Sequence, residues 1–194
     1  MSIQHAVIPD AQLHEPKGVI SASAGEAYLA DGAGSGIWYP VQKAQAACIR
    51  AASTGATTGV TTAYQAINNA TLGGTIVWAA NNIINMTADT TSGYITIPET
   101  GSYTISYTAN IVTNTNGSIF HFTLGIDSGA GIVSQEAFIS AIITTSGVVD
   151  SNLVAFNCLP SFAANDKVYI MCKETTAGEE FTLWNSNFVV VRVN

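Results

Sequence analysis

The strongest candidate for chemistry is the carboxylate of Asp127, which ends an apolar run in the sequence Gly125-Ile126-Asp127-Ser128-Gly129-Ala130. An apolar strand that ends in Asp-Ser-Gly is the pattern of one half of an aspartic peptidase, in which two carboxylates share a proton and activate water. Such a dimeric enzyme also needs an apolar-apolar-Gly segment downstream, and Thr145-Ser146-Gly147 does not supply it. We therefore predict a hairpin turn, with Asp127 accepting backbone N–H groups and the glycines at positive φ.

The three histidines are too scattered to predict a metal site. His5, His14 and His121 show none of the short spacings that place two ligands on one face of an element. His121 stands between Phe120 and Phe122 in an alternating run, so its side chain is expected to point away from theirs. We predict a structural or interface-lining histidine rather than a base.

Other polar segments give weaker signals. The glycine-rich run at 32–36 lacks the Lys and Thr of a phosphate loop and opens no helical pattern, which indicates a turn. Glutamates surround Lys173 in the loop at 173–180, where a calcium ion stays an alternative to a solvated hairpin. Because no paired-carboxylate spacing is present, we expect no enzyme, no cofactor and no metal.

The cysteine count argues against a disulfide framework. Cys48, Cys158 and Cys172 are an odd number without CxxC spacing, which favours buried free thiols. A single bridge between Cys158 and Cys172 stays open, because these two residues could meet across neighbouring strands.

The charge distribution excludes nucleic acid as a partner. Charged residues make up 10% of the 194 residues, and residues 51–166 contain six carboxylates but no Lys or Arg. Binding to DNA or RNA depends on clustered cations, and the same lack disfavours an anionic membrane surface. No long apolar window predicts a membrane span, and the first five residues do not form a secretory signal. We expect synthesis in a cytoplasm.

From about residue 46 the sequence alternates with the period of a β-strand. Apolar residues alternate with Thr and Ser across 95–107, on both sides of a turn at 98–101. Further strand-like runs lie at 119–124, 132–133, 138–143, 153–159, 168–172 and 181–193. Turn residues in the gaps and the lack of a helical period predict an all-β sandwich or jelly roll. Residues 56–92 are broken into short pieces and predict no clear element.

Residues 1–45 have a different character. Turn signals such as Pro9-Asp10 and Pro16-Lys17-Gly18 separate short apolar pieces that cannot form a core of their own. We therefore predict an extended N-terminal arm that lies on another surface, with Leu29, Ile37 and Tyr39 among its apolar contacts. A structured pair of strands is the alternative.

Three parts of the second region resemble the C1q/TNF family of jelly rolls. The segment from Gly93 to Tyr107, with its Gly101-Ser102-Tyr103, looks like the turn that leads into a central strand of that family. The segment 159–170 is similar to the family's Gly-Asp-Lys-Val hairpin, although Asn165 stands where glycine is usual. The run 181–193 resembles the closing strand. The resemblance implies a jelly-roll domain at 46–194 and a homotrimer with aromatic-lined faces.

The N-terminal region resembles a segment found in virion proteins of tailed bacteriophages. The similarity is carried by Leu13-His14-Glu15-Pro16-Lys17-Gly18-Val19 and by the stretch 28–38. It implies a structural virion protein: a trimeric capsid decoration, or cement, protein that binds the major capsid protein on the outer capsid surface and stabilises the head. The alternative is the receptor-binding tip of a head or tail fibre, which would recognise a host-surface glycan through loops such as 113–118 and 173–180.

These resemblances imply two sets of contact residues. The residues expected in the capsid-binding arm are Ile8, Leu13, His14, Glu15, Pro16, Lys17, Val19, Tyr28 and Trp38. The residues expected in the trimer interface are Tyr103, Tyr107, Phe120, Phe122, Tyr169 and Phe188, because the aromatic side chains exceed what one thin sandwich core was expected to need.

Overall fold

The computed structural model describes residues 23, 25–30, 36–41, 43–53, 60–68, 70–72, 76–113, 119–143, 152–175 and 180–193. The chain divides into two compact units, Met1–Lys43 and Ala44–Asn194. All regular elements in the described residues are strands, and no helix among them has the length and apolarity needed to cross a membrane.

The N-terminal unit contains a β-hairpin. Strand β1 (Glu26–Ala30) pairs with β2 (Gly36–Pro40) in antiparallel register, so that Tyr28 lies opposite Trp38 and Leu29 lies opposite Ile37. For residues 26–30 and 36–40 the strand pair, which was the alternative to an extended arm, is therefore observed.

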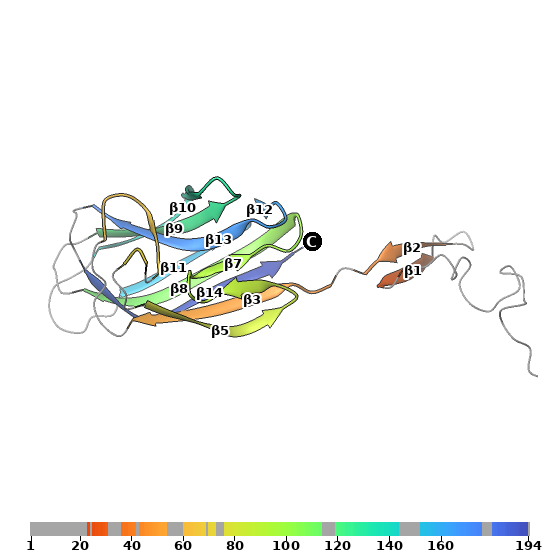
Figure 1. The fold of residues 1–194 in the computed structure, drawn as a ribbon, viewed down its shortest axis with the longest axis horizontal. Helices are drawn as coiled ribbons and strands as arrows, with labels where there is room; N and C mark the ends of the chain where they lie inside the picture. Colours follow the sequence, from red (N-terminus) through yellow and green to blue (C-terminus); the bar gives the residue numbers. More distant parts are fainter. Residues whose placement is uncertain are drawn as a thin grey trace, which may run out of the picture. The chain divides into compact units, whose positions relative to one another are not determined.

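The second unit is a sandwich of two six-stranded sheets in the described part of the chain (Figure 1). The first, called the β13 sheet, contains β10 (Ile132–Ile143), β9 (Ile119–Asp127), β13 (Lys167–Glu174), β7 (Tyr94–Thr96) and β6 (Thr87–Asp89) in this order, with β4 (Gln65–Ala66) also paired to β13. The second, called the β14 sheet, contains β11 (Asn152–Cys158), β8 (Gly101–Thr113), β14 (Phe181–Arg192), β3 (Ala46–Ser53) and β5 (Ile76–Ile84), with β12 (Ser161–Phe162) paired to β8.

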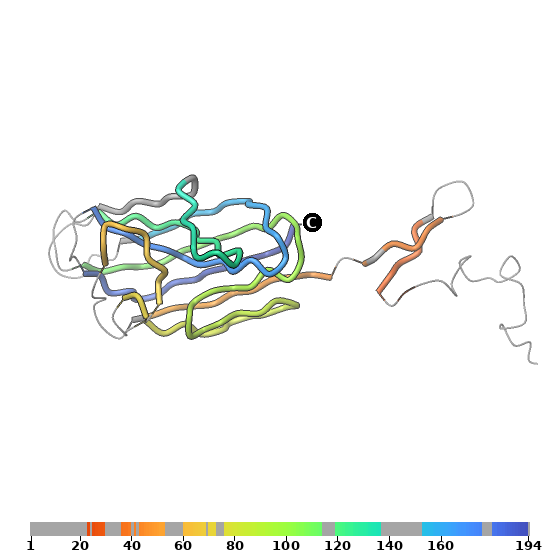
Figure 2. Tube along the Cα trace, turned by 45° about the horizontal axis from the view of Figure 1, so that its top comes forward, coloured from red at the N-terminus to blue at the C-terminus, as the bar shows by residue number. Residues whose placement is uncertain are grey.

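The connections make this sandwich a jelly roll. The chain changes sheet at every connection from β3 to β6, between β7 and β8, between β8 and β9, between β10 and β11, between β12 and β13, and between β13 and β14 (Figure 2). All of the strand pairs in these two sheets are antiparallel. The predicted all-β jelly-roll class is confirmed.

Alternation along β8 shows how the core forms. Tyr103, Ile105, Tyr107 and Ile111 point inward and are fully buried, whereas the Thr and Ser residues between them lie on the other side of the sheet. The neighbouring strand β14 places Phe188 opposite Tyr107. The strands predicted from the period of two are therefore observed with one face in the core.

Aromatic rings fill the space between the sheets. Phe122 of the β13 sheet stacks with Tyr107 of the β14 sheet at 6.3 Å between ring centroids, and its ring also contacts that of Phe181 at 5.8 Å. Phe120 makes an edge contact with Phe181 at 5.3 Å. Removing one such buried ring costs about 3–5 kcal/mol of folding free energy, so these residues dominate the stability of the single chain.

The stretch that gave no clear prediction, 56–92, contains the nine-residue strand β5, the short strands β4 and β6, and local turns where it is described. The Asn68 side chain accepts the backbone N–H groups of Ala70 and Thr71, and the Trp78 indole donates to the carbonyl of Ile67 at 2.7 Å. Side-chain hydrogen bonds of this kind fix irregular backbone without a repeating apolar pattern.

Candidate functional site

The Asp127 carboxylate organises a turn. Its Oδ1 atom accepts the backbone N–H of Gly129 at 2.8 Å and that of Gly131 at 3.1 Å, and both glycines have positive φ, 99° and 107°. These bonds are the ones predicted for a hairpin turn, so the structural interpretation of this motif is confirmed.

His121 lies on the opposite side of β9 from its two neighbours. Phe120 and Phe122 are fully buried in the core, whereas His121 is half-buried on the outer side, beside Lys173 of β13. Within the described residues no three His, Cys, Asp or Glu side chains are close enough to hold a metal ion. The glutamates suggested for a calcium ion in the loop at 173–180 fall partly outside the described residues, as does the loop 113–118.

The three cysteines are free thiols, so the bridge between Cys158 and Cys172 is not formed. Cys172 is buried in the core and Cys158 and Cys48 are half-buried. Burial raises the pKa of the Cys158 thiol to about 11, because the charged thiolate would lose its hydration. Burial likewise raises the pKa of Cys172. Neither thiol is therefore activated as a nucleophile.

The predicted trimer-interface residues lie inside the single chain. The side chains of Tyr103, Tyr107, Phe120, Phe122 and Phe188 are fully buried between the two sheets. A ring that is already covered within one chain has no surface left for a partner, so their assignment to an interface is corrected. The core of the jelly roll contains more aromatic side chains than we expected from the sequence.

Tyr169 differs from the other five because it lies outside the main core. It belongs to a small cluster on the outer side of the β13 sheet, together with Ala66, Met171, Tyr64 and Tyr94. Its ring lies 5.2 Å from that of Tyr94, and burial raises its pKa to about 12. Tyr169 is thus nearly covered by its own chain as well.

The predicted arm residues can be placed only in part. Ile8, Leu13, His14, Glu15, Pro16, Lys17 and Val19 lie outside the described residues. Tyr28 and Trp38 face each other across the hairpin, with ring centroids 5.3 Å apart in an edge contact.

The other face of this hairpin is apolar and exposed. Leu29 and Ile37 lie opposite each other and expose 53% and 56% of their surface, and Tyr39 exposes 47%. An isolated two-stranded hairpin is marginally stable in water. Both faces of this one carry apolar side chains, so a further surface that covered them would stabilise it.

The outer face of the β14 sheet is a second candidate surface, which the sequence reasoning missed. The side chains on this face alternate with the buried ones along β3, β5, β8, β11 and β14. They include Thr104, Ser106, Thr108, Asn110, Val112, Val77, Ala79, Cys48, Arg50, Ala52, Leu153, Ala155, Asn157, Asn187, Val189 and Val191.

This face has an unusual charge composition for an exposed surface. Among its described side chains the only charged group is Arg50, whose guanidinium donates to Asn187 Oδ1 at 2.9 Å, and no carboxylate is present. Leu153 exposes 66% of its surface, and Trp184, at the bulge in β14, exposes 57%. Depletion of charge with exposed large apolar side chains is typical of a protein interface.

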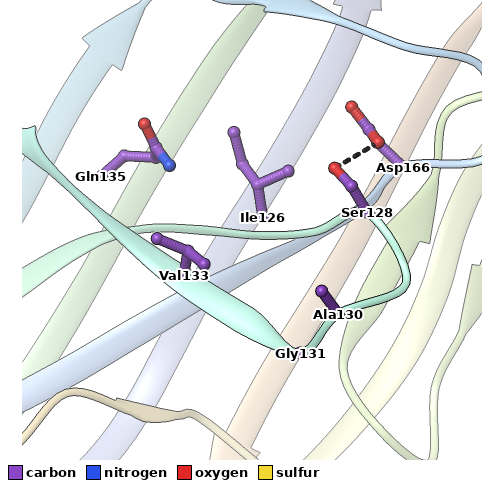
Figure 3. Close-up of a pocket in the computed structure, with 7 residues that line it drawn as sticks. All are labelled: Ile126, Ser128, Ala130, Gly131, Val133, Gln135 and Asp166. Carbon is purple, nitrogen blue, oxygen red and sulfur yellow. Dashed lines mark hydrogen bonds between the residues drawn. The ribbon is translucent and has the colours of Figure 1, made fainter.

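A pocket lies near the turn that Asp127 organises (Figure 3). It has a volume of about 350 Å³ and is lined by Ile126, Ser128, Ala130, Gly131, Val133, Gln135 and Asp166. Within it the Ser128 hydroxyl donates to Asp166 Oδ1 at 2.7 Å. Histidine, lysine and cysteine are absent from the residues that line this pocket.

Comparison of the whole chain with known proteins identifies its fold, but it finds no relative by sequence similarity. No protein-family model matches the sequence, and no curated protein matches it significantly. Among solved structures, the chain is similar to Eiger TNF from S. frugiperda with a TM-score of 0.55 and 13% identity, over 79% of this chain and 94% of that one.

Two other solved structures give similar values. The globular domain of zebrafish complement 1qA protein matches with a TM-score of 0.53 and 15% identity, over 79% of this chain and 98% of that one. Murine APRIL, in a crystal structure at pH 5.0, matches with a TM-score of 0.52 and 8% identity, over 76% and 99% of the two chains. At these identities the likeness is one of fold, and the fold of this chain is a jelly roll of the TNF and C1q type.

Proposed function

We propose that this chain is a non-enzymatic structural protein of a tailed-bacteriophage virion, a trimeric decoration protein on the outer surface of the capsid. In this proposal the protein is made in the host cytoplasm, and its N-terminal unit binds the major capsid protein. The observation that carries the proposal is the separate N-terminal unit, whose hairpin exposes Leu29, Ile37 and Tyr39. The sequence of the same unit resembles segments of virion proteins.

The outer face of the β14 sheet supports the trimeric part of the proposal. A stable protein interface buries about 1,200–2,000 Å² in total, and a nearly uncharged sheet face of five strands is a surface of suitable chemistry. The C1q/TNF family, which the sequence resembles, is typically trimeric. Three copies arranged around an axis would cover Leu153 and Val189 on each face.

A decoration protein would stabilise the head by mass action. A protein that binds the assembled shell and not its separated subunits adds RT ln(1 + [L]/Kd) per occupied site to the stability of the shell. This mechanism needs a binding surface and a rigid body, and it needs no catalytic residue.

The decisive experiment removes the N-terminal unit. Full-length protein and a variant lacking residues 1–43 would each be mixed with capsids that lack the protein, and the copies bound per capsid would be measured. We expect the truncated protein to keep the β-sheet circular dichroism and the mass of a trimer but to lose capsid binding. Capsid binding by the truncated protein would contradict the proposal.

The copy number per virion distinguishes decoration from the fibre alternative. Decoration of the capsid lattice requires hundreds of copies, whereas fibres need a few dozen at most. The pocket beside Ser128 and Asp166 is the observation that keeps a ligand-binding tip as the second candidate.

A further inference from the structure

We propose that the pocket formed by the β9–β10 turn is a binding site for a neutral, hydroxyl-rich ligand, and specifically for a terminal neutral sugar residue. This goes beyond capsid decoration and does not depend on it. Figure 3 shows the pocket, with Ile126 on β9, Val133 and Gln135 on β10, and Asp166 beside Ser128 of the turn.

The position of the pocket follows from the register of the edge strand. Val133 lies opposite Ile126, and Gln135 lies opposite Leu124, which is fully buried in the core. Because residues directly opposite each other share a face, Val133 and Gln135 point to the core side of the β13 sheet. Val133 nevertheless exposes 61% of its surface, so the pocket lies at the edge of the core and is open to solvent.

The walls of the pocket are held rigidly. Asp127 fixes the turn through its two backbone hydrogen bonds, and the Ser128 hydroxyl ties this turn to Asp166, which precedes β13. The second oxygen of Asp166 accepts the backbone N–H of Ala163 at 2.9 Å. A site that is formed before the ligand arrives loses less entropy on binding.

The polar groups of the pocket are mainly acceptors. A carboxylate has about four lone-pair positions and donates nothing, and each Asp166 oxygen holds one protein donor. The Ser128 hydroxyl already gives its proton to Asp166, so its lone pairs remain for a ligand. The Gln135 amide can accept or donate. A ligand must therefore bring hydrogen-bond donors.

The charge of the pocket excludes anionic ligands. Residues 51–166 contain no Lys or Arg. The neighbouring Lys167 places its ammonium 5.1 Å from the centre of the Tyr94 ring, on the outer side of the sheet. A phosphate, sulfate or sialic acid would meet the Asp166 carboxylate with no cation of the pocket lining to offset the repulsion.

The apolar lining favours a neutral ligand over an ammonium ion. Ile126, Ala130 and Val133 line the pocket, and Asp166 exposes only 7% of its surface. Both Asp166 oxygens already accept a protein donor, which weakens their attraction for a cation, and an ammonium ion that reached them past these apolar side chains would lose part of its hydration, at a greater cost than a hydroxyl group. A sugar ring combines hydroxyl donors at its rim with C–H groups on its faces, and about 350 Å³ lies in the range of ligand pockets, ~300–1,000 Å³.

The test uses the full-length protein and a panel of neutral methyl glycosides: glucoside, galactoside, mannoside and the two N-acetylhexosaminides. Binding would be followed by titration calorimetry and by the methyl NMR signals of Ile126 and Val133. We expect at least one glycoside to bind and to shift these signals. Butylammonium and N-acetylneuraminic acid serve as the cationic and anionic probes.

Two variants locate the site. Val133→Glu places a carboxylate in the pocket and should weaken glycoside binding by about tenfold or more, or ~1.4 kcal/mol. Ile132→Glu adds the same charge at the adjacent position, which points to the other side of β10, and should leave binding unchanged. Ser128→Ala should weaken binding while the circular dichroism of the sheet is retained.

Each remaining outcome would overturn the proposal. Failure of all five glycosides to bind would exclude a neutral sugar site, and binding of butylammonium alone would show that the ligand class is wrong. Equal binding by Val133→Glu and Ile132→Glu would show that the glycosides bind elsewhere.

Discussion

Two aspartates of the jelly roll act through oxygen atoms that hold backbone N–H groups in place. Asp127 closes the β9–β10 turn, and Asp166 holds Ala163 and Ser128 beside the start of β13. The turn that contains Asp166 also places Asn165 at a φ of 72°, in the left-handed region where glycine is the easiest residue to accommodate. Asparagine tolerates this region better than most residues, which explains how a residue other than glycine occupies this position.

Single buried groups make the protein sensitive to alkali. Burial raises the pKa of Cys158 from 9.0 to about 11 and that of Tyr169 from 10.0 to about 12. In both residues the protonated form is the one favoured by the folded state, so the unfolded chain releases its protons at lower pH. Their contribution to stability is therefore complete below about pH 9 and is lost as the pH rises through 11 and 12.

We expect the free energy of unfolding to fall as the pH is raised above about 9. Urea unfolding followed by circular dichroism across this range would measure it. Tyr169→Phe removes the titrating hydroxyl and keeps the ring, so it should reduce the slope between pH 10 and 12. The prediction fails if this variant and the original protein lose stability in parallel.

At the scale of elements, the alternating pattern was sufficient to locate most strands of the sandwich. Strands β8, β9, β13 and β14 lie where the sequence predicted them. Burial alternates along β8 and along most of β14, whereas the central residues of β9 and β13 are buried on both faces. Strands β4, β5 and β6 were not predicted: β4 and β6 have only two or three residues and carry no period, and burial alternates only over the first residues of β5. β4 pairs with the distant β13, whereas β6 forms a local hairpin with β7.

The contact surfaces were harder to predict for a physical reason. Alternation separates the two sides of a strand, but it does not say whether the buried side faces its own chain or a partner. Tyr107 and Phe188 lie on the core side of the β14 sheet, and Val189 lies on the other. The outer face of the β14 sheet could not be identified from the sequence, because its neutral side chains come from five strands and are brought together only by the register of the sheet.

A charge placed at the centre of this face tests its role in association. Val189 is half-buried and lies between Cys48 on β3 and Ser106 on β8. In Val189→Asp an unpaired carboxylate would be buried in the proposed interface, so we expect the proposed trimer to dissociate at concentrations at least about tenfold higher than for the original protein. Native mass spectrometry over a dilution series measures the fraction of trimer.

A matched variant controls for the added charge. Ala70 is exposed in the segment that precedes β5, and Ala70→Asp adds the same carboxylate away from the β14 sheet. It should leave the trimer intact, and both variants should keep the circular dichroism of the sandwich. Loss of the trimer in both variants, or in neither, would refute the assignment of this face.

The two units of the molecule present surfaces of different chemical character. The N-terminal unit presents an apolar hairpin, and the jelly roll presents a nearly neutral sheet face together with an acceptor-rich pocket. With six Lys and Arg residues in 194, the chain has little means of binding through ion pairs. We therefore expect association at the whole-molecule scale to depend on burial of apolar and neutral polar surface.

Salt dependence distinguishes this form of association from an electrostatic one. Charges interact over a Debye length of about 10 Å at 0.1 M salt, and an interface built on ion pairs weakens as that length shrinks. Because Arg50 is the single charged group among the described side chains of the β14-sheet face, the dissociation constant of the trimer should change little between low and high sodium chloride. Analytical ultracentrifugation would measure this constant. Any residual salt dependence should disappear in Arg50→Ala, whereas a strong dependence that survives this substitution would place the contact on another, charged part of the surface.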